Sequence, residues 1–177
     1  MNPATIYLGA ALLCALAGAV YDWRYRRIPN ALTRPAALLG LGLHLVLGGW
    51  PAMSAALLAG LVAGGVFLLF FLAGGMGGGD VKLIAAVLCC AGWQHVAEIL
   101  IATALAGGIM ALALALTHGR LRQTVSNVGT LLLHHASAGL GPHSNLHVRN
   151  AQTLRLPYGI AICAGTAMTL LSVVQGR

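Results

Sequence analysis

Long apolar segments alternate along the chain with short groups of charged, polar and glycine residues. A helix that crosses a membrane needs about 20 predominantly apolar residues, and several of these segments reach that length. The pattern predicts an all-α, polytopic membrane protein with about six transmembrane helices, in a single domain over residues 1–177. The expected spans cover residues 3–20, 30–49, 53–73, 80–92, 96–117 and 157–174.

A polar segment at about 118–156 separates the last two expected spans. Within it, apolar residues recur at helical spacing, from Leu121 through Val125 and Val128 to Leu132. This spacing is typical of an amphipathic helix at a membrane surface, and an irregular loop is the alternative. In both cases we expect the segment to be cytoplasmic or interfacial.

The overall composition also indicates a membrane location. Apolar residues make up 59% of the 177 residues, charged residues make up 7%, and the mean hydropathy is +0.86. A soluble domain carries about 25% charged residues. A soluble surface cannot be assembled from so few, so the apolar side chains are expected to face lipid.

The basic residues orient the expected spans. When the chain crosses the membrane at each span, nine of its ten Lys and Arg residues fall on one side and only Arg177 on the other. Cytoplasmic loops collect Lys and Arg, which explains the net charge of +7 without a nucleic-acid partner. We therefore expect a multi-pass protein of the inner (plasma) membrane with both termini external. Arg24, Arg26 and Arg27 follow the first apolar run, so this run is expected to be an anchor rather than a signal peptide.

Neither the cysteines nor the histidines predict a metal site. The four cysteines lie inside apolar runs and form no CxxC pair, which argues against a zinc knuckle. His143 and His147 are spaced i, i+4, but no cysteine or acidic residue accompanies them or their neighbours His134 and His135. We expect these four histidines to be solvated, with no metal and no cofactor bound.

The chain contains three acidic residues: Asp22, Asp80 and Glu98. Ionisable residues in membrane spans are expensive and are commonly functional. Asp22 ends the first span and Asp80 begins the fourth, so two intervening crossings return the chain to the same face. Facing carboxylates share a proton, so that one activates a water while the other polarises a peptide carbonyl. The alternative is that each aspartate caps a helix or pairs with an arginine.

A glycine tract at 74–79 precedes Asp80. The expected fourth span is only about 20 Å long at about 1.5 Å per residue, so either the bilayer thins there or the tract dips below the membrane surface. We consider the second case. Gly77 and Gly79 would then provide the backbone geometry, through positive φ or close approach, to receive an extended substrate. Lys82 is a candidate substrate contact, with an interfacial anchor as the alternative.

Three stretches of the sequence resemble a known family. Residues 22–30 (DWRYRRIPN), 77–83 (GGGDVKL) and 157–161 (PYGIA) resemble motifs of the aspartic type IV prepilin peptidases, which are GxGD membrane proteases. The resemblance implies a membrane aspartic endopeptidase that cleaves the leader peptide of a prepilin at the cytoplasmic membrane face. Its catalytic residues would be Asp22 and Asp80. Its partners would be the prepilin, through its leader and N-terminal helix, and membrane lipid.

The short form looks most like the peptidases of Flp/Tad-type pilus systems. Larger members carry an additional region with paired CxxC motifs and also methylate the new N-terminus, so methyltransferase activity is not expected here. Archaeal preflagellin peptidases share the motifs. Presenilin-like proteases also use Tyr-Asp and GxGD, but their larger helix count and late motif position argue against them.

A function of another class is a cation-coupled transporter subunit that uses Asp22 and Asp80 as an ion site. Transporters usually place such a site near mid-membrane within a repeated half. Here both aspartates are expected near one face, and no repeat is visible. A structural assembly subunit is a third alternative, in which the aspartates would be dispensable.

Overall fold

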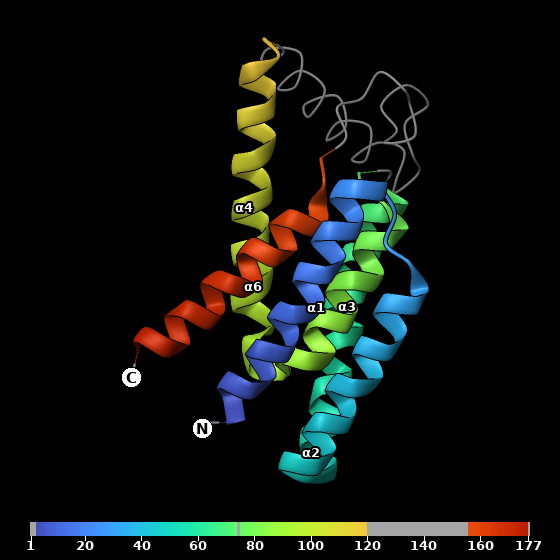
Figure 1. Cartoon of the computed structure of the whole chain (residues 1–177), viewed down its shortest axis with the longest axis vertical. Helices are drawn as coiled ribbons and strands as arrows, with labels where there is room; N and C mark the ends of the chain where they lie inside the picture. Colours follow the sequence, from blue (N-terminus) through green and yellow to red (C-terminus); the bar gives the residue numbers. More distant parts are fainter. Residues whose placement is uncertain (1–2, 74, 120–155, 177) are drawn as a thin grey trace.

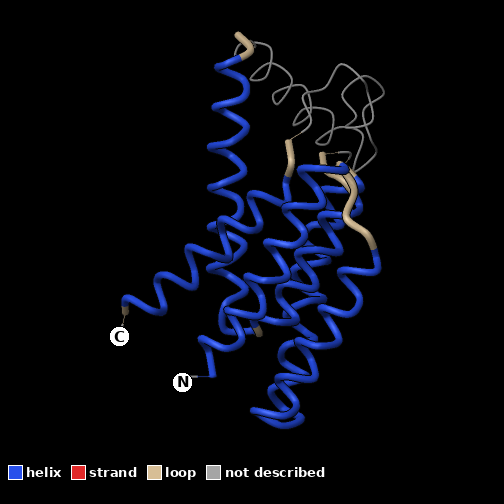
Figure 2. The backbone as a smooth tube through the Cα atoms, in the orientation of Figure 1, coloured by secondary structure: helices blue, strands red, loops and turns tan. Residues whose placement is uncertain are grey.

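The computed structural model describes residues 3–73, 75–119 and 156–176, and this part of the chain contains helices joined by short turns, without strands. This confirms the predicted all-α class (Figures 1 and 2). The predicted amphipathic helix within 118–156 falls almost wholly outside the described residues. In chain order the elements are α1 (Pro3–Tyr25), α2 (Asn30–Leu72), α3 (Gly78–Ala91), the short 3₁₀ helix η1 (Trp93–His95), α4 (Val96–Thr117) and α6 (Tyr158–Gln175).

The expected count of about six spans is not confirmed. Four helical segments of the described chain are long and apolar enough to cross a membrane: Pro3–Tyr25, Asn30–Leu72, Trp93–Thr117 and Tyr158–Gln175. Two causes account for the difference. The spans expected at 30–49 and 53–73 both lie in α2, and α3, with 14 residues, is too short.

The long helix α2 is interrupted where two spans were expected to meet. Gly49 has φ 71° and ψ −169°, which are not helical, and Pro51 follows two residues later. A positive φ is readily adopted by glycine alone. Figure 1 shows that α2 reverses direction at the lower end of the bundle. The two parts of α2 are therefore two helices joined across a sharp kink.

Helix α3 forms the centre of the bundle and packs against both α1 and α2. Its side chains Leu83, Ile84, Val87 and Leu88 are fully buried. Small residues let the neighbouring helices approach it closely, as is common among membrane helices. A Cβ atom on Gly60 of α2, for example, would lie 2.9 Å from the carbonyl oxygen of Ala85.

The outer surface of the bundle is strongly apolar. Val46 is 82% exposed and Leu39 is 74% exposed on α2, and Ile109 is 68% exposed on α4. A surface of this kind is what a membrane protein presents to lipid, where neighbouring acyl chains cover it.

Three helix ends meet at one end of the bundle. Figure 1 shows that α1 ends, and α3 and α6 begin, at the upper end, whereas α1 begins and α6 ends at the lower end. Helix α6 packs against α1 and α4. This arrangement brings the residues around Asp22, Asp80 and Tyr158 together from distant parts of the sequence.

Candidate active site

A cavity of about 1010 Å³ opens where α1 ends and α2 and α3 begin. Both Asp22 and Asp80 line it, as do Gly77, Gly79 and Lys82. The cavity thus brings together all five residues that the sequence analysis singled out for the site.

Helix α1 ends sharply beside this cavity. Arg26 has φ 51°, in the left-handed region, and its N–H donates to the carbonyl oxygen of Asp22 at 2.9 Å. A left-handed residue just after the last helical one is a common way to end a helix. The chain then turns back, so that Ile28 packs against the start of α3, near Gly79.

Asp80 occupies the first turn of α3 and is 8% exposed. Its Oδ2 accepts a hydrogen bond from the Gly77 N–H at 3.2 Å, and its own N–H donates to the Gly77 carbonyl at 3.1 Å. Free N–H groups and the helix dipole attract negative charge to a helix N-terminus. Asp80 therefore does cap α3, as one alternative held, while its carboxyl group also lines the cavity.

Asp22 is half-buried in the last turn of α1. Its Oδ2 accepts a hydrogen bond from the backbone N–H of Gly159, 137 residues away, at 3.0 Å. A carboxylate near the C-terminus of its own helix is disfavoured by that helix's dipole. Gly159 lies in the first turn of α6, however, so the N-terminus of α6 offsets this effect.

The two carboxyl groups therefore form a pair. They line the same cavity and lie close enough to interact electrostatically. In each of the two carboxyl groups, the Oδ2 atom accepts a hydrogen bond from a backbone N–H at the start of a helix. Two carboxyl groups that interact in this way do not both ionise readily.

The backbone conformations of Gly77 and Gly79 differ from those expected. Gly77 has φ −85° and ψ 147°, Gly79 is helical, and neither has a positive φ. The expectation of positive φ there is wrong, because the tract passes directly into α3. Both glycines do lie close to other groups of the protein: a Cβ on Gly79 would lie 3.2 Å from the Ile28 Cβ, and one on Gly77 would lie 3.2 Å from the Asp80 Oδ2.

Lys82 is exposed and lines the cavity. Its Nζ donates to the Oδ1 of Asn30 at 2.9 Å. Because Asn30 begins α2, this hydrogen bond links the starts of α2 and α3. An exposed bond of this kind contributes little to stability, about 1 kcal/mol or less, and leaves the lysine available to a ligand.

The rest of the cavity wall is mainly apolar and basic. The aromatic residues Tyr21, Tyr25 and Phe71 line the cavity, and so do three basic residues: Arg26, Arg27 and Lys82. Such a lining suits a peptide segment with apolar side chains.

The contact between α6 and Asp22 could not be identified from the sequence. A glycine at position 159 does not by itself indicate that its backbone N–H donates a hydrogen bond to a carboxylate. The only available signal was the resemblance of residues 157–161 to a family motif. Tyr158, the first residue of α6, also lies within electrostatic range of Asp80.

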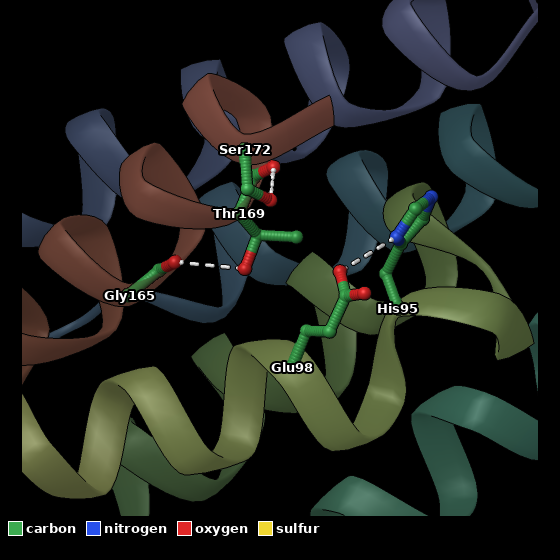
Figure 3. Close-up of polar contacts among 5 residues, drawn as sticks. All are labelled: His95, Glu98, Gly165, Thr169 and Ser172. Carbon is green, nitrogen blue, oxygen red and sulfur yellow. Dashed lines mark hydrogen bonds and ion pairs between the residues drawn. The ribbon is translucent and has the colours of Figure 1, made fainter. Parts of the chain in front are cut away.

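The third acidic residue has a separate partner. Glu98 Oε2 lies 3.3 Å from the His95 Nδ1 (Figure 3). His95 and Glu98 follow the end of α3, whereas Asp80 lies at its start. The described residues contain no group of three or more potential metal ligands. His134, His135, His143 and His147 lie outside the described residues.

Comparison with known proteins agrees with this geometry. Residues 9–112 match the type IV leader peptidase family. Two proteins named prepilin leader peptidase/N-methyltransferase, from Burkholderia pseudomallei strains 1026b and K96243, are each 36% identical to the chain over 131 residues. The matched part is 68% of this chain and 41% of each relative, so the chain spans less than half the length of these relatives. No solved structure matches the chain significantly.

Proposed function

We propose that this chain, which belongs to the type IV leader peptidase family, is a membrane aspartic endopeptidase that removes the leader peptide of prepilins. The observation that carries the proposal is the pairing of Asp22 and Asp80 in one cavity, each held by a helix N-terminus. The names of the two relatives support the choice of substrate.

In the proposed mechanism the carboxyl pair holds one proton. The ionised member accepts a proton from a water as the water attacks the peptide carbonyl carbon, and the protonated member donates a hydrogen bond to the carbonyl oxygen. Proton transfer to the leaving nitrogen then releases the two peptide products. The hydrogen bonds from Gly77 and Gly159 fix one oxygen of each carboxyl group, which leaves the other oxygen for water and substrate.

The cavity wall fits a prepilin segment in this account. An extended strand lies along the tract that includes Gly77 and Gly79, where the absence of side chains permits close approach. The rings of Tyr21, Tyr25 and Phe71 contact apolar side chains of the substrate. Lys82 contacts a polar group of the substrate at the rim.

The charge distribution supports a cytoplasmic active site. Among described residues, Arg24 lies in the last turn of α1, Arg34 near the start of α2 and Lys82 near the start of α3. All three helix ends are near the aspartate pair, and basic residues accumulate on the cytoplasmic side. We propose a single domain in the inner membrane, of the Flp/Tad type, with the segment at 118–156 cytoplasmic or interfacial and both termini external.

Co-expression with a candidate prepilin tests the proposal. Leader removal shortens the substrate, so the processed form migrates faster on a denaturing gel, and N-terminal sequencing of the product locates the cleaved bond. We expect processing only when the peptidase is present. A transporter subunit or assembly factor would leave the precursor intact.

A further inference from the structure

Helix α6 contributes to the aspartate pair from outside the matched family region. The match covers residues 9–112, which include Asp22 and Asp80 but not Gly159. Yet the Gly159 N–H donates to Asp22 at 3.0 Å. The arrangement of Asp22 thus depends on a helix that enters the bundle late in the chain.

We infer that Gly159 is a positioning residue for the proposed peptidase reaction, and that the N-terminus of α6 sets the orientation of the Asp22 carboxyl group. This inference rests on the proposed function. Three features of Gly159 carry it: its hydrogen bond, its burial and its lack of a side chain.

The hydrogen bond selects one orientation of the carboxyl group. The Asp22 Oδ2 is the acceptor, and the donor is the backbone N–H of Gly159, which belongs to α6. A hydrogen bond from a fixed donor to an ionised acceptor is stronger than a neutral one. With Oδ2 held there, Oδ1 is the oxygen available to a water or to the partner carboxyl group.

The missing side chain lets α6 come close enough to make this bond. A Cβ on residue 159 would lie 3.0 Å from the Asp22 Cβ, 3.2 Å from its Oδ2 and 3.2 Å from the Ala19 Cα. Two of these contacts are with the acidic side chain itself and one is with the backbone of α1. Any larger residue must therefore push α6 and Asp22 apart.

The contact between α6 and α4 provides a matched control. A Cβ on Gly107 of α4 would lie 3.4 Å from the Tyr158 Cε1 and 3.7 Å from the Ala161 Cβ, which are ordinary contacts. Gly107→Ala therefore adds a methyl group at the start of α6 without displacing Asp22. Gly159→Ala adds the same group against the carboxyl side chain.

Steady-state cleavage of a prepilin substrate by purified protein is the first measurement. A displacement of 1 Å costs about 10²-fold, so the few tenths of an ångström required here should lower kcat about threefold to tenfold for Gly159→Ala while KM changes little. Gly107→Ala should retain the kcat of the unmodified protein. Equal kcat values for the two variants, or a change confined to KM, would overturn the positioning role.

A second measurement does not depend on cleavage. In protein labelled with ¹⁵N-glycine, the amide signal of Gly159 is identified by its loss in Gly159→Ala. Asp22→Asn replaces the charged acceptor and should shift this signal, whereas Glu98→Gln should leave it in place. An unmoved Gly159 signal in Asp22→Asn would overturn the inference even if the unmodified protein processes prepilins. Failure of that protein to process any prepilin would instead refute the proposed function.

Discussion

The contact between Gly79 and Ile28 gives the sharpest prediction about how the fold supports the site. Gly79 immediately precedes Asp80 in the first turn of α3, and a Cβ on it would lie 3.2 Å from the Ile28 Cβ and 3.5 Å from the Ile28 backbone nitrogen. Carbon atoms in ordinary contact are 3.4–4 Å apart. An alanine at this position therefore moves either α3 or Ile28 by a few tenths of an ångström.

The expected loss follows from this distance. Because Asp80 is the next residue on the same helix turn, it shares the shift, and Gly79→Ala should reduce kcat by about threefold to tenfold. Gly79→Val adds two more methyl groups toward Ile28 and should reduce kcat by about 10²-fold. An extra methyl in tight packing costs about 1–3 kcal/mol, but alanine is favoured over glycine in a helix by about 1 kcal/mol. Gly79→Ala should therefore still accumulate in the membrane.

Gly78→Ala is the control for this experiment. It lies in the same turn, and its Cβ would make an ordinary contact, 3.5 Å from the Phe71 Cε2. The assay is the rate of leader removal in membranes, normalised to the amount of peptidase. Only glycine at position 28 removes the Cβ that causes the clash, so the double variant Gly79→Ala with Ile28→Gly should have a higher rate than the product of the two single effects predicts. Equal rates for Gly78→Ala and Gly79→Val would refute the reasoning.

Two further predictions concern topology and metal dependence. Reporter fusions at Ser137 and Arg177 should give opposite compartment signals, cytoplasmic and external respectively, and matching signals would contradict the proposed orientation. Because two carboxyl groups and a water suffice for the reaction, EDTA should leave cleavage intact, as should replacing His143 and His147 together by Ala. Zinc-restored activity after EDTA would instead indicate a metalloprotease.

The sequence was most informative about the aspartates. Acidic residues are so rare in this chain that Asp22 and Asp80 stood out, and counting the crossings between them predicted that they meet at one face. The structure brings both into one cavity. The count of about six spans is not confirmed: the break expected between residues 49 and 53 is present in α2, but α3, with 14 residues, is short for a membrane span.

The contacts that hold the site could not be predicted in the same way. Every residue except proline has a backbone N–H, so the donors at Gly77 and Gly159 become visible only once the helix ends are placed. The role of Gly79 was also incompletely predicted. Its spacing from Asp80 indicated a need for glycine, but only the position of Ile28 shows that the cause is packing rather than positive φ.

The most direct test of the central claim is leader removal by Asp22→Asn and Asp80→Asn, each co-expressed with a prepilin substrate. Asparagine keeps the shape of the side chain but cannot act as the base, so each variant should lose about 10⁴-fold or more in rate. We predict that only the precursor is seen with either variant, that both variants accumulate in the membrane, and that Glu98→Gln processes the substrate normally. Processing by Asp22→Asn or Asp80→Asn at the rate of the unmodified protein would contradict the account.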